Sequence, residues 1–249
     1  MLKKILIKTF ELISIFRSAY IKYVIGDKYS SARGKNDVIN HFQKDEIKDC
    51  YEFFKEYFYQ ASFMPTDGLR EYGIKEAIAL EDKDNLFLEF GVFTGNSINY
   101  FSKFLDKDRI IYGFDSFVGL RENWLSSVGL KGISFNLNKK LPKVNSNCVL
   151  INGWVQDTLD AFLIEKNVKK IGFVHMDLDT YESSKYVLEK IKPFLSKNSV
   201  IIFDNLYNKI GWKIGEFKAL NQVFEENEIR YEVFAYKNEQ VLVRVNISN

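Results

Sequence analysis

Two apolar segments in the second half of the chain each end in polar side chains that could act together. The residues concerned are Asp177, Asp179, Asp204 and Asn205. Neighbouring strands lie about 4.8 Å apart, so groups at two adjacent strand ends can reach one ion. Oxygen ligands favour magnesium, calcium or manganese over zinc. This pattern predicts a site for a hard divalent cation, although Asp179 is also placed to cap a helix that we expect near Thr180.

A histidine alternates with the first of these carboxylates. His175 and Asp177 would lie on the same face of one strand, and the sequence contains only two histidines. A buried core histidine and a catalytic histidine both fit this position.

A glycine turn follows an earlier apolar segment, in Glu89-Phe90-Gly91-Val92-Phe93-Thr94-Gly95-Asn96-Ser97. Gly91 and Gly95 would let the backbone turn sharply and approach a ligand, and the N-terminus of the next helix would offer N–H groups to an anion. The spacing is not the G-x-G-x-x-G of dinucleotide-binding folds, and no G-K-[ST] phosphate loop is present. A plain tight turn is the alternative.

Two further strand ends could complete a nucleoside site. Asp115 lies some twenty residues after the glycine turn, where a carboxylate can accept both hydroxyls of a ribose. Helix capping alone would also explain it, but the glycine turn favours the ligand. Gly153 and Trp154 follow the next apolar segment and suit a flat base, unless Trp154 is a core residue.

The elements that must position these residues form a regular alternation. We expect strands over 86–90, 110–114, 148–151, 171–178 and 200–203, and helices over 97–105, 158–165, 181–194 and 215–227. Such alternation predicts parallel β-α-β units. The segments 231–235 and 240–245 are joined by a few polar residues and must pair antiparallel. The predicted fold is α/β: a doubly wound, Rossmann-like, mostly parallel sheet with an antiparallel C-terminal hairpin.

Helices precede this sheet. Helical periodicity predicts amphipathic helices over 47–61 and 66–80, with Cys50 in the core, and an apolar stripe from Leu2 to Val24. Lys8 and Glu11 interrupt the apolar stretch of sequence and no small-residue cleavage site follows, so we expect neither a signal peptide nor a membrane span. We expect it to contact the domain or a second subunit in a homo-oligomer, and a peripheral contact with an anionic membrane is the alternative. The predicted domains are a helical extension, 1–63, and an α/β domain, 64–249.

The amino-acid composition indicates which classes of binding partner are disfavoured for this protein. Lys+Arg number 35 and Asp+Glu 33, a net charge of +2, which disfavours nucleic acid as the main partner. Hydrophobic residues make up 46% and charged residues 27%, as in a globular protein. Cys50 and Cys148 form no C-x-x-C pair, so we expect a reduced, cytoplasmic protein.

Five motifs together resemble a known family. In order they are E-F-G-V-F-T-G-N-S, F-D-S-F-V-G-L, G-W-V-Q-D-T-L, H-M-D-L-D-T-Y and I-I-F-D-N-L-Y. They are similar to the class I S-adenosylmethionine-dependent O-methyltransferases, and most of all to the macrocin O-methyltransferase group, which methylates sugar hydroxyls. The resemblance covers about Met64 to the C-terminus.

The resemblance implies roles for individual residues. The methionine part of the cofactor would be surrounded by Glu89, Gly91, Gly95 and Ser97. Asp115, with Ser116 beside it, would bind the ribose, and Gly153 with Trp154 the adenine. Magnesium would be held by Asp177, Asp204 and Asn205, a trio also similar to that of catechol O-methyltransferase.

Two positions depart from the family pattern. Lys197-Asn198 stands where relatives have a glycine pair, and asparagine tolerates a left-handed turn. Many sugar-acting relatives carry two aspartates where this chain has Asp204-Asn205, which leaves the strength of metal binding open.

The expected function is magnesium-dependent methyl transfer from S-adenosylmethionine to the hydroxyl of a sugar or nucleotide-linked sugar, with Asp177 or Asp179 as proton acceptor. The irregular segment 121–144 carries lysines that could face a nucleotide diphosphate or simply be solvated: Lys131, Lys139, Lys140 and Lys143. The alternatives are a catechol or phenol acceptor, a non-catalytic nucleotide-binding scaffold and, disfavoured by the glycine spacing, a dehydrogenase.

Overall fold

The computed structural model describes residues 38–80, 85–121 and 135–247. The chain divides into two compact units, residues 1–45 and 46–249. Helix α3, Val38–Phe58, begins in the first unit and ends in the second. The helix expected over residues 2–24 lies outside the described residues. Among those that are described, no helix combines the length and apolar character needed to cross a membrane.

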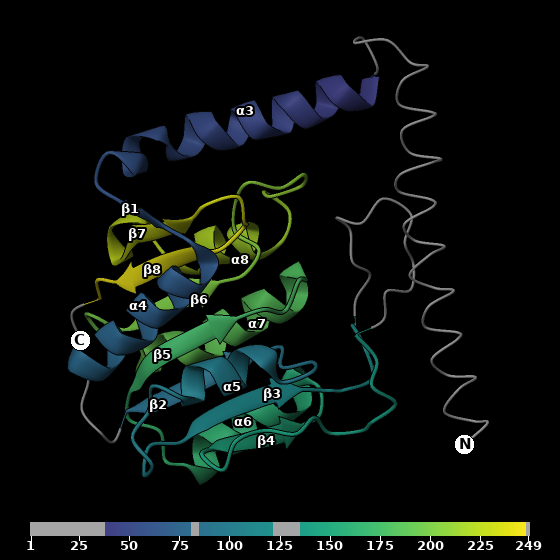
Figure 1. Ribbon diagram of the computed structural model, residues 1–249, viewed down its shortest axis with the longest axis vertical. Helices are drawn as coiled ribbons and strands as arrows, with labels where there is room; N and C mark the ends of the chain where they lie inside the picture. The colour runs from purple at the N-terminus through teal and green to yellow at the C-terminus, as the bar shows by residue number, and fades with distance from the viewer. Residues whose placement is uncertain (1–37, 81–84, 122–134, 248–249) are drawn as a thin grey trace. The chain divides into compact units, whose positions relative to one another are not determined.

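The described strands of the second unit form one sheet of eight strands (Figure 1). Its order is β1-β7-β8-β6-β5-β2-β3-β4, and β8 runs antiparallel to both of its neighbours. The strands are β1 (Ser62–Met64), β2 (Leu86–Phe90), β3 (Ile111–Asp115), β4 (Cys148–Asn152), β5 (Ile171–Met176), β6 (Val200–Phe203), β7 (Ile229–Ala235) and β8 (Val241–Val245). The doubly wound, mostly parallel fold with an antiparallel hairpin is confirmed.

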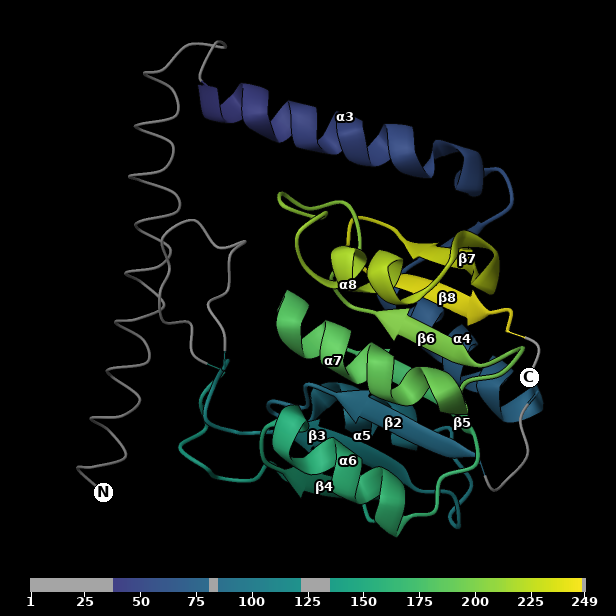
Figure 2. The same cartoon turned by 180° about the vertical axis from the view of Figure 1, so that it is seen from behind.

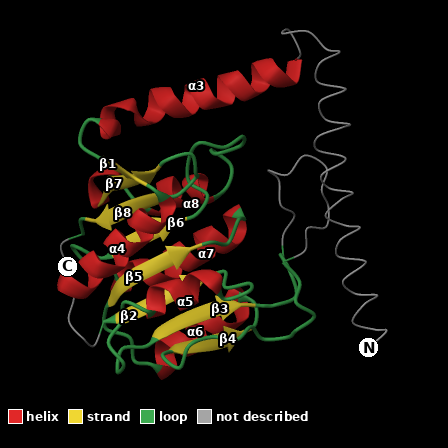
Figure 3. Cartoon of the chain, viewed as in Figure 1, coloured by secondary structure: helices red, strands yellow, loops and turns green. Residues whose placement is uncertain are grey.

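Helices cover both faces of this sheet. They are α4 (Thr66–Leu80), α5 (Asn96–Ser102), α6 (Val155–Glu165), α7 (Tyr181–Ile191) and α8 (Glu216–Val223), with short 3-10 turns at Lys192–Phe194 and Glu226–Glu228. Apolar residues of α4 and α5 share one core with the sheet, and those of α6, α7 and α8 share the other. Figure 1 shows the first pair in front and Figure 2 shows the other three. Figure 3 shows the same layers by element type.

The apolar residues of the strands and helices explain where the buried core lies. Every residue of β5 is buried, as expected for a parallel strand covered by helices on both faces. The helices instead bury one stripe, as α7 does with Val187, Leu188 and Ile191. Cys50 is 4% exposed, which confirms its place in the core.

The register of the parallel strands places the predicted site residues at one edge of the sheet. Phe90, the last residue of β2, is aligned with Phe114 of β3 and with Met176 of β5. Met176 is aligned in turn with Phe203 of β6. The residues that follow these strand ends therefore lie side by side. Because β2 is flanked by β3 on one side and β5 on the other, this edge is the point where the strand order reverses, the usual binding position in such sheets.

The structure corrects three sequence expectations. The helix expected over 47–61 instead runs from Val38 to Phe58, and Ser62–Met64 form strand β1, which pairs parallel with β7. The C-terminal hairpin is therefore not the edge of the sheet, because β1 lies outside it. Helix α6 begins three residues before Thr158, with Trp154 at its N-cap. A strand of three residues is too short for its periodicity to be recognised.

Two further expectations concern the turn at Asn198 and the boundary between the predicted domains. Asn198 adopts a φ of 82°, the left-handed turn that was expected where relatives have glycine. The domain boundary at 63/64 stays a prediction; strand β1 spans it and already belongs to the sheet.

Candidate active site

A cleft of about 700 Å³, counting its solvent-open part, lies where the strand order reverses. It is lined by residues that follow β2, β3, β4 and β5, and by the start of α7. The predicted site residues in its wall are Gly91, Asp115, Ser116, Gly153, Trp154, Asp177 and Asp179. The other predicted residues do not line it: Glu89, Gly95, Ser97, Asp204 and Asn205.

The glycine turn brings the backbone against the next strand end. Gly91 has a φ of 90°, and a Cβ there would come within 1.8 Å of the Asp177 carbonyl oxygen. No other residue type fits this position without moving the loop after β5. Gly95 is instead the N-cap of α5, where a Cβ would meet Pro142 and Val144 at 3.3–3.4 Å. The first glycine shapes the cleft, and the second packs against a neighbouring loop.

Asp115 holds the glycine turn as well as lining the cleft. Its Oδ2 accepts hydrogen bonds from the backbone N–H groups of Val92 (2.9 Å) and Phe93 (2.8 Å). Its Oδ1 accepts one from Phe117 N–H at 2.7 Å. Each carboxylate oxygen has two lone pairs, so Oδ1 retains one for a ligand hydroxyl. The structural and the binding roles of Asp115 are therefore compatible.

Glu89 and Ser97 lie beneath the glycine turn, away from the cleft. Both side chains are buried, and the Ser97 hydroxyl donates a hydrogen bond to Glu89 Oε1 at 2.8 Å. This bond connects the end of β2 to the first turn of α5. The structure thus places both residues where they support the turn.

Another part of the cleft wall is formed by the start of α6 and the two residues before it. Gly153 has a φ of 148°, and a Cβ there would meet the Thr158 side chain at 2.7 Å. Trp154 is only partly buried and lines the cleft, so it is not a core tryptophan.

Ser116 accepts a hydrogen bond from Val118 N–H (3.3 Å) and donates one to the Gly119 carbonyl (3.0 Å).

The acidic side chains meet at the end of the cleft nearest β5 and β6. Ligand atoms of His175, Asp177 and Asp204 lie within 4.8 Å of one another. Burial, and next the charge of Asp204, raises the pKa of Asp177 well above its ordinary value. Burial also raises the pKa of Asp179 to about 6, although the nearby Lys209 ammonium opposes this. Asp179 has a φ of 59°, which is uncommon outside glycine.

His175 lies beneath this cluster and is completely buried. Its Nδ1 is 3.4 Å from Glu89 Oε2, and its Nε2 is 3.8 Å from Asp204 Oδ1. Burial alone would lower the pKa of His175, but the two carboxylates outweigh it and raise the pKa to about 9. A protonated imidazole between two carboxylates is an electrostatic support and a poor metal ligand. His175 also does not line the cleft.

Asp204 has two partners that come from distant parts of the chain. Arg70 of α4 donates to its Oδ1 at 3.2 Å, and Gln240 of β8 donates to the same oxygen. Arg70 also donates to the Gln240 side chain at 3.2 Å. The second oxygen, Oδ2, is the one left for a ligand.

The Asn205 amide has hydrogen-bond partners on other residues than Asp204. The amide oxygen accepts a hydrogen bond from Lys209 Nζ at 2.7 Å, and the amide nitrogen donates one to Asp179 Oδ1 at 3.1 Å. Asn205 and Asp179 line a second, smaller cavity of about 400 Å³ together with Lys209. The structure therefore brings together two of the three predicted metal ligands, Asp177 and Asp204, and directs the third to other partners.

The donor set suits a hard cation in part. Asp177 and Asp204 offer carboxylate oxygens, and the pKa of Asp177 is raised first by burial and next by repulsion from Asp204, which a cation would relieve. The Asn205 oxygen retains one lone pair beyond its bond to Lys209. Two carboxylates with waters are a ligand set that magnesium accepts.

Sequence reasoning missed four residues that contact the acidic loops: Arg70, Lys209, Glu216 and Gln240. No local motif marks them. Arg70 and Asp204 are 134 positions apart in the chain, so only the fold brings them together.

Comparison with known proteins found similar methyltransferases. Residues 88–206 match a methyltransferase domain. CalS11, described as a calicheamicin methyltransferase, aligns with a TM-score of 0.58 and 25% identity over 70% of this chain and 76% of its own. NovP, described as an O-methyltransferase, aligns with a TM-score of 0.51 and 18% identity over 72% and 78%. The comparison with curated proteins found no match.

The match spans the strands and loops that form the cleft, from β2 to the residues after β6. The domain match and the likeness to CalS11 support a class I S-adenosylmethionine-dependent O-methyltransferase. This confirms the resemblance that the five motifs indicated.

Proposed function

We propose that this enzyme transfers a methyl group from S-adenosylmethionine to a sugar hydroxyl with the help of a divalent cation. The observation that carries the proposal is the position of the acidic cluster, since Asp177 and Asp179 line the end of the cleft. CalS11, which resembles this chain, is also described as a TDP-rhamnose 3'-O-methyltransferase; in that structure the identity is 24% over 70% of this chain.

The cleft has the shape and polarity to hold the cofactor. Asp115 presents a free lone pair for the ribose hydroxyls, and Trp154 offers a flat apolar face for the adenine. Because Gly91 has no side chain, the glycine turn packs directly against the loop that carries Asp177. When bound, S-adenosylmethionine supplies a methyl group to the acceptor oxygen, while its sulfur keeps the electrons of the broken bond and S-adenosylhomocysteine remains.

The residues of the chain must hold the acceptor and remove its proton. An alcohol is a poor nucleophile at neutral pH, so the hydroxyl proton must move as the oxygen–carbon bond forms. Asp177 and Asp179 are the carboxylates in the cleft wall that can receive it. Alignment of oxygen, carbon and sulfur is the remaining requirement, and a cleft on rigid strand ends provides it.

A divalent cation would be held by Asp177 and Asp204, with Asn205 as a third ligand through its remaining lone pair. It would favour loss of the proton from the acceptor hydroxyl. Arg70 and Gln240 keep Asp204 in place by occupying one of its oxygens.

The acceptor itself is tested by a panel of substrates. Methyl transfer is measured by mass spectrometry with nucleotide-linked sugars, free sugars and catechol, each with and without magnesium. We expect the fastest transfer to a sugar hydroxyl and loss of transfer in excess chelator. Transfer to catechol alone would replace the sugar by a phenol, and cofactor binding without any transfer would favour a nucleotide-binding scaffold.

Other expectations stay predictions. They are the homo-oligomer, the membrane contact of the segment from Leu2 to Val24, and the cytoplasmic location. The lysines at 139, 140 and 143 are exposed and do not line the cleft, and Lys131 lies outside the described residues.

A further inference from the structure

Glu216 is a completely buried carboxylate that bonds to two loops of the active site. It is the first residue of α8. Its Oε1 accepts a hydrogen bond from the Leu178 N–H at 3.3 Å, and its Oε2 accepts one from the Asn205 N–H at 3.0 Å. One side chain thus joins the loop after β5 to the loop after β6.

These two N–H groups lie inside the acidic motifs. Leu178 separates Asp177 from Asp179, and Asn205 directly follows Asp204. Any change in the two bonds would alter the spacing between the carboxylates on the two loops. Helix α8, which carries Glu216, packs beside α7 on the same face of the sheet (Figure 2).

Burying a carboxyl group costs free energy, because the group loses its contacts with water. Burial raises the pKa of Glu216 to about 8, and the charges of Asp204 and Asp179 add to this, while the Asn205 N–H opposes it. An apolar side chain of similar size would fill the space without that desolvation. A carboxyl group, however, keeps an acceptor lone pair on each oxygen in either protonation state. Two separate acceptor atoms are therefore the property that this position requires.

We propose that Glu216 is a positioning residue for methyl transfer, which sets the distance between the loop that carries Asp177 and Asp179 and the loop that carries Asp204 and Asn205. This inference rests on the proposed function, because the proposed function is what gives those four side chains a role in methyl transfer. It assigns no contact between Glu216 and the substrates.

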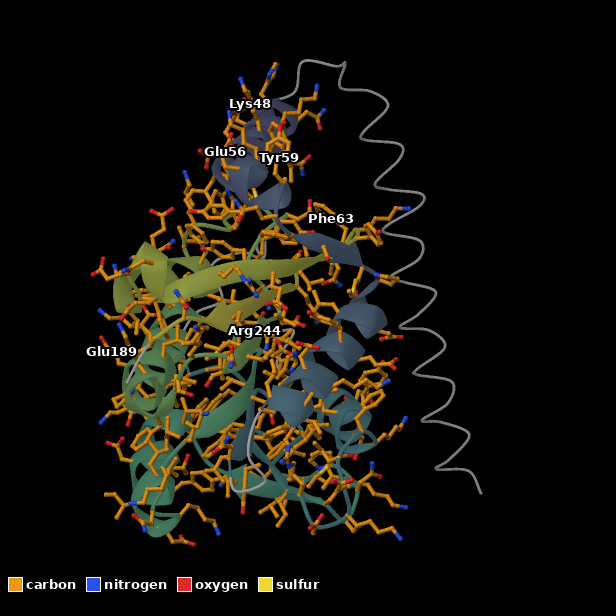
Figure 4. All side chains as sticks on the ribbon, turned by 90° about the vertical axis from the view of Figure 1, so that its left-hand side faces the viewer. Lys48, Glu56, Tyr59, Phe63, Glu189 and Arg244 are labelled. Atoms are coloured by element: carbon orange, nitrogen blue, oxygen red, sulfur yellow. The ribbon has the colours of Figure 1, made fainter. Side chains whose placement is uncertain are left out.

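The test compares Glu216→Gln with Glu189→Gln. Glutamine keeps the size of the side chain but has one acceptor oxygen, so it can hold only one loop, and its amide would face the other N–H. Glu189 lies on the exposed surface of α7 and serves as the matched control (Figure 4). Glu216→Asp, which is too short to reach both loops, is a second variant in case the first does not fold.

Three quantities are measured for each variant: kcat on whichever acceptor the wild type methylates, the Kd for S-adenosylmethionine by calorimetry, and hydrogen exchange of the Leu178 and Asn205 amides by NMR. We expect kcat to fall about 10- to 100-fold in Glu216→Gln, as for a small misplacement of reacting groups. The cofactor Kd should stay within about twofold, and at least one of the two amides should exchange faster. Glu189→Gln should match the wild type.

The outcomes separate this inference from the proposed function. Faster amide exchange with an unchanged kcat would show that Glu216 is structural only, and unchanged exchange would show that the two bonds are not made. An equal loss of kcat and cofactor affinity would indicate general damage and would also overturn the positioning role. If the wild type methylates a phenol instead of a sugar, the proposed acceptor is wrong. The role of Glu216 is then still tested, by comparing kcat of the variants with the phenol as acceptor.

Discussion

The amide nitrogen of Asn205 donates a hydrogen bond to Asp179 Oδ1 at 3.1 Å, while its oxygen accepts one from Lys209 at 2.7 Å. Lysine can only donate and a carboxylate oxygen can only accept, so these partners fix the orientation of the amide. An aspartate at position 205 would instead face Asp179 with a like charge. The two partners therefore favour asparagine over aspartate at position 205.

Asn205→Asp should therefore destabilise the protein. We expect a loss of about 1–3 kcal/mol in the free energy of unfolding at neutral pH, because a hydrogen bond is replaced by repulsion between two carboxylates. Urea denaturation measures it, with Asn221→Asp on the exposed side of α8 as control. Magnesium should restore part of the loss if a cation binds here, and an unchanged midpoint would contradict this picture of the loop.

Loss of the charge on Asp204 should stop catalysis without preventing cofactor binding. Asp204→Asn keeps an oxygen acceptor for Arg70 and Gln240, so it disturbs the fold less than alanine would. We expect kcat to fall roughly 100-fold or more, about 2.7 kcal/mol of transition-state stabilisation. Initial rates and calorimetry with S-adenosylmethionine measure the two effects.

Excess chelator is the companion experiment to this substitution. It should abolish turnover of the wild type, and magnesium should restore it there but not in Asp204→Asn. Full wild-type activity in chelator would remove the metal from the mechanism and leave these carboxylates as bases or hydrogen-bond acceptors.

Substitution of Asp115 should weaken cofactor binding. Asp115→Asn replaces one acceptor oxygen with an amide group, which would face the N–H groups of the glycine turn or of Phe117. We expect the Kd for S-adenosylmethionine to rise about 10- to 100-fold, roughly 1.4–2.8 kcal/mol. Calorimetry with S-adenosylmethionine and with NAD measures this, and Asp157→Asn on the exposed face of α6 is the control. Binding of NAD alone would identify a different cofactor.

Acid should destabilise the sheet through Glu232 and Arg244. Burial alone would raise the pKa of Glu232, but hydrogen bonds from Arg244 (2.8 and 3.0 Å), Tyr72 and Arg230 lower it to about 2. The side chain is 13% exposed, so solvent screens this pair weakly. Figure 4 labels Arg244 on β8.

The sign of the effect follows from the lowered pKa. Between pH 4.5 and 2 the unfolded chain binds a proton at Glu232 that the folded chain does not, so this stabilisation is complete above about pH 4.5 and is lost as the pH falls toward 2. We expect a loss of roughly 2–3 kcal/mol over that window. Urea denaturation at several pH values should show a smaller acid dependence in Glu232→Gln than in Glu189→Gln. Equal slopes in both variants would assign the acid sensitivity to other groups.

The sequence by itself determined every described strand except β1, and the edge of the sheet where the functional residues lie. Apolar runs such as Leu86–Phe90 and Val200–Phe203 match the observed strands, because burial on both faces demands continuous apolar side chains. Since parallel strands end at one edge, the residues after them had to gather there. Short-range signals of this kind identified Gly91, Asp115 and Asp177.

Only the tertiary structure decided which of the predicted residues share a cavity and which partners each one has. Glu89 and Ser97 belong to the glycine motif by sequence, yet they lie beneath the turn, because alternation along β2 directs Glu89 into the core. Arg70 reaches Asp204 from a helix 134 positions earlier. Contacts between residues so far apart in the chain depend on how the helices pack on the sheet. They cannot be predicted from periodicity or from a local motif.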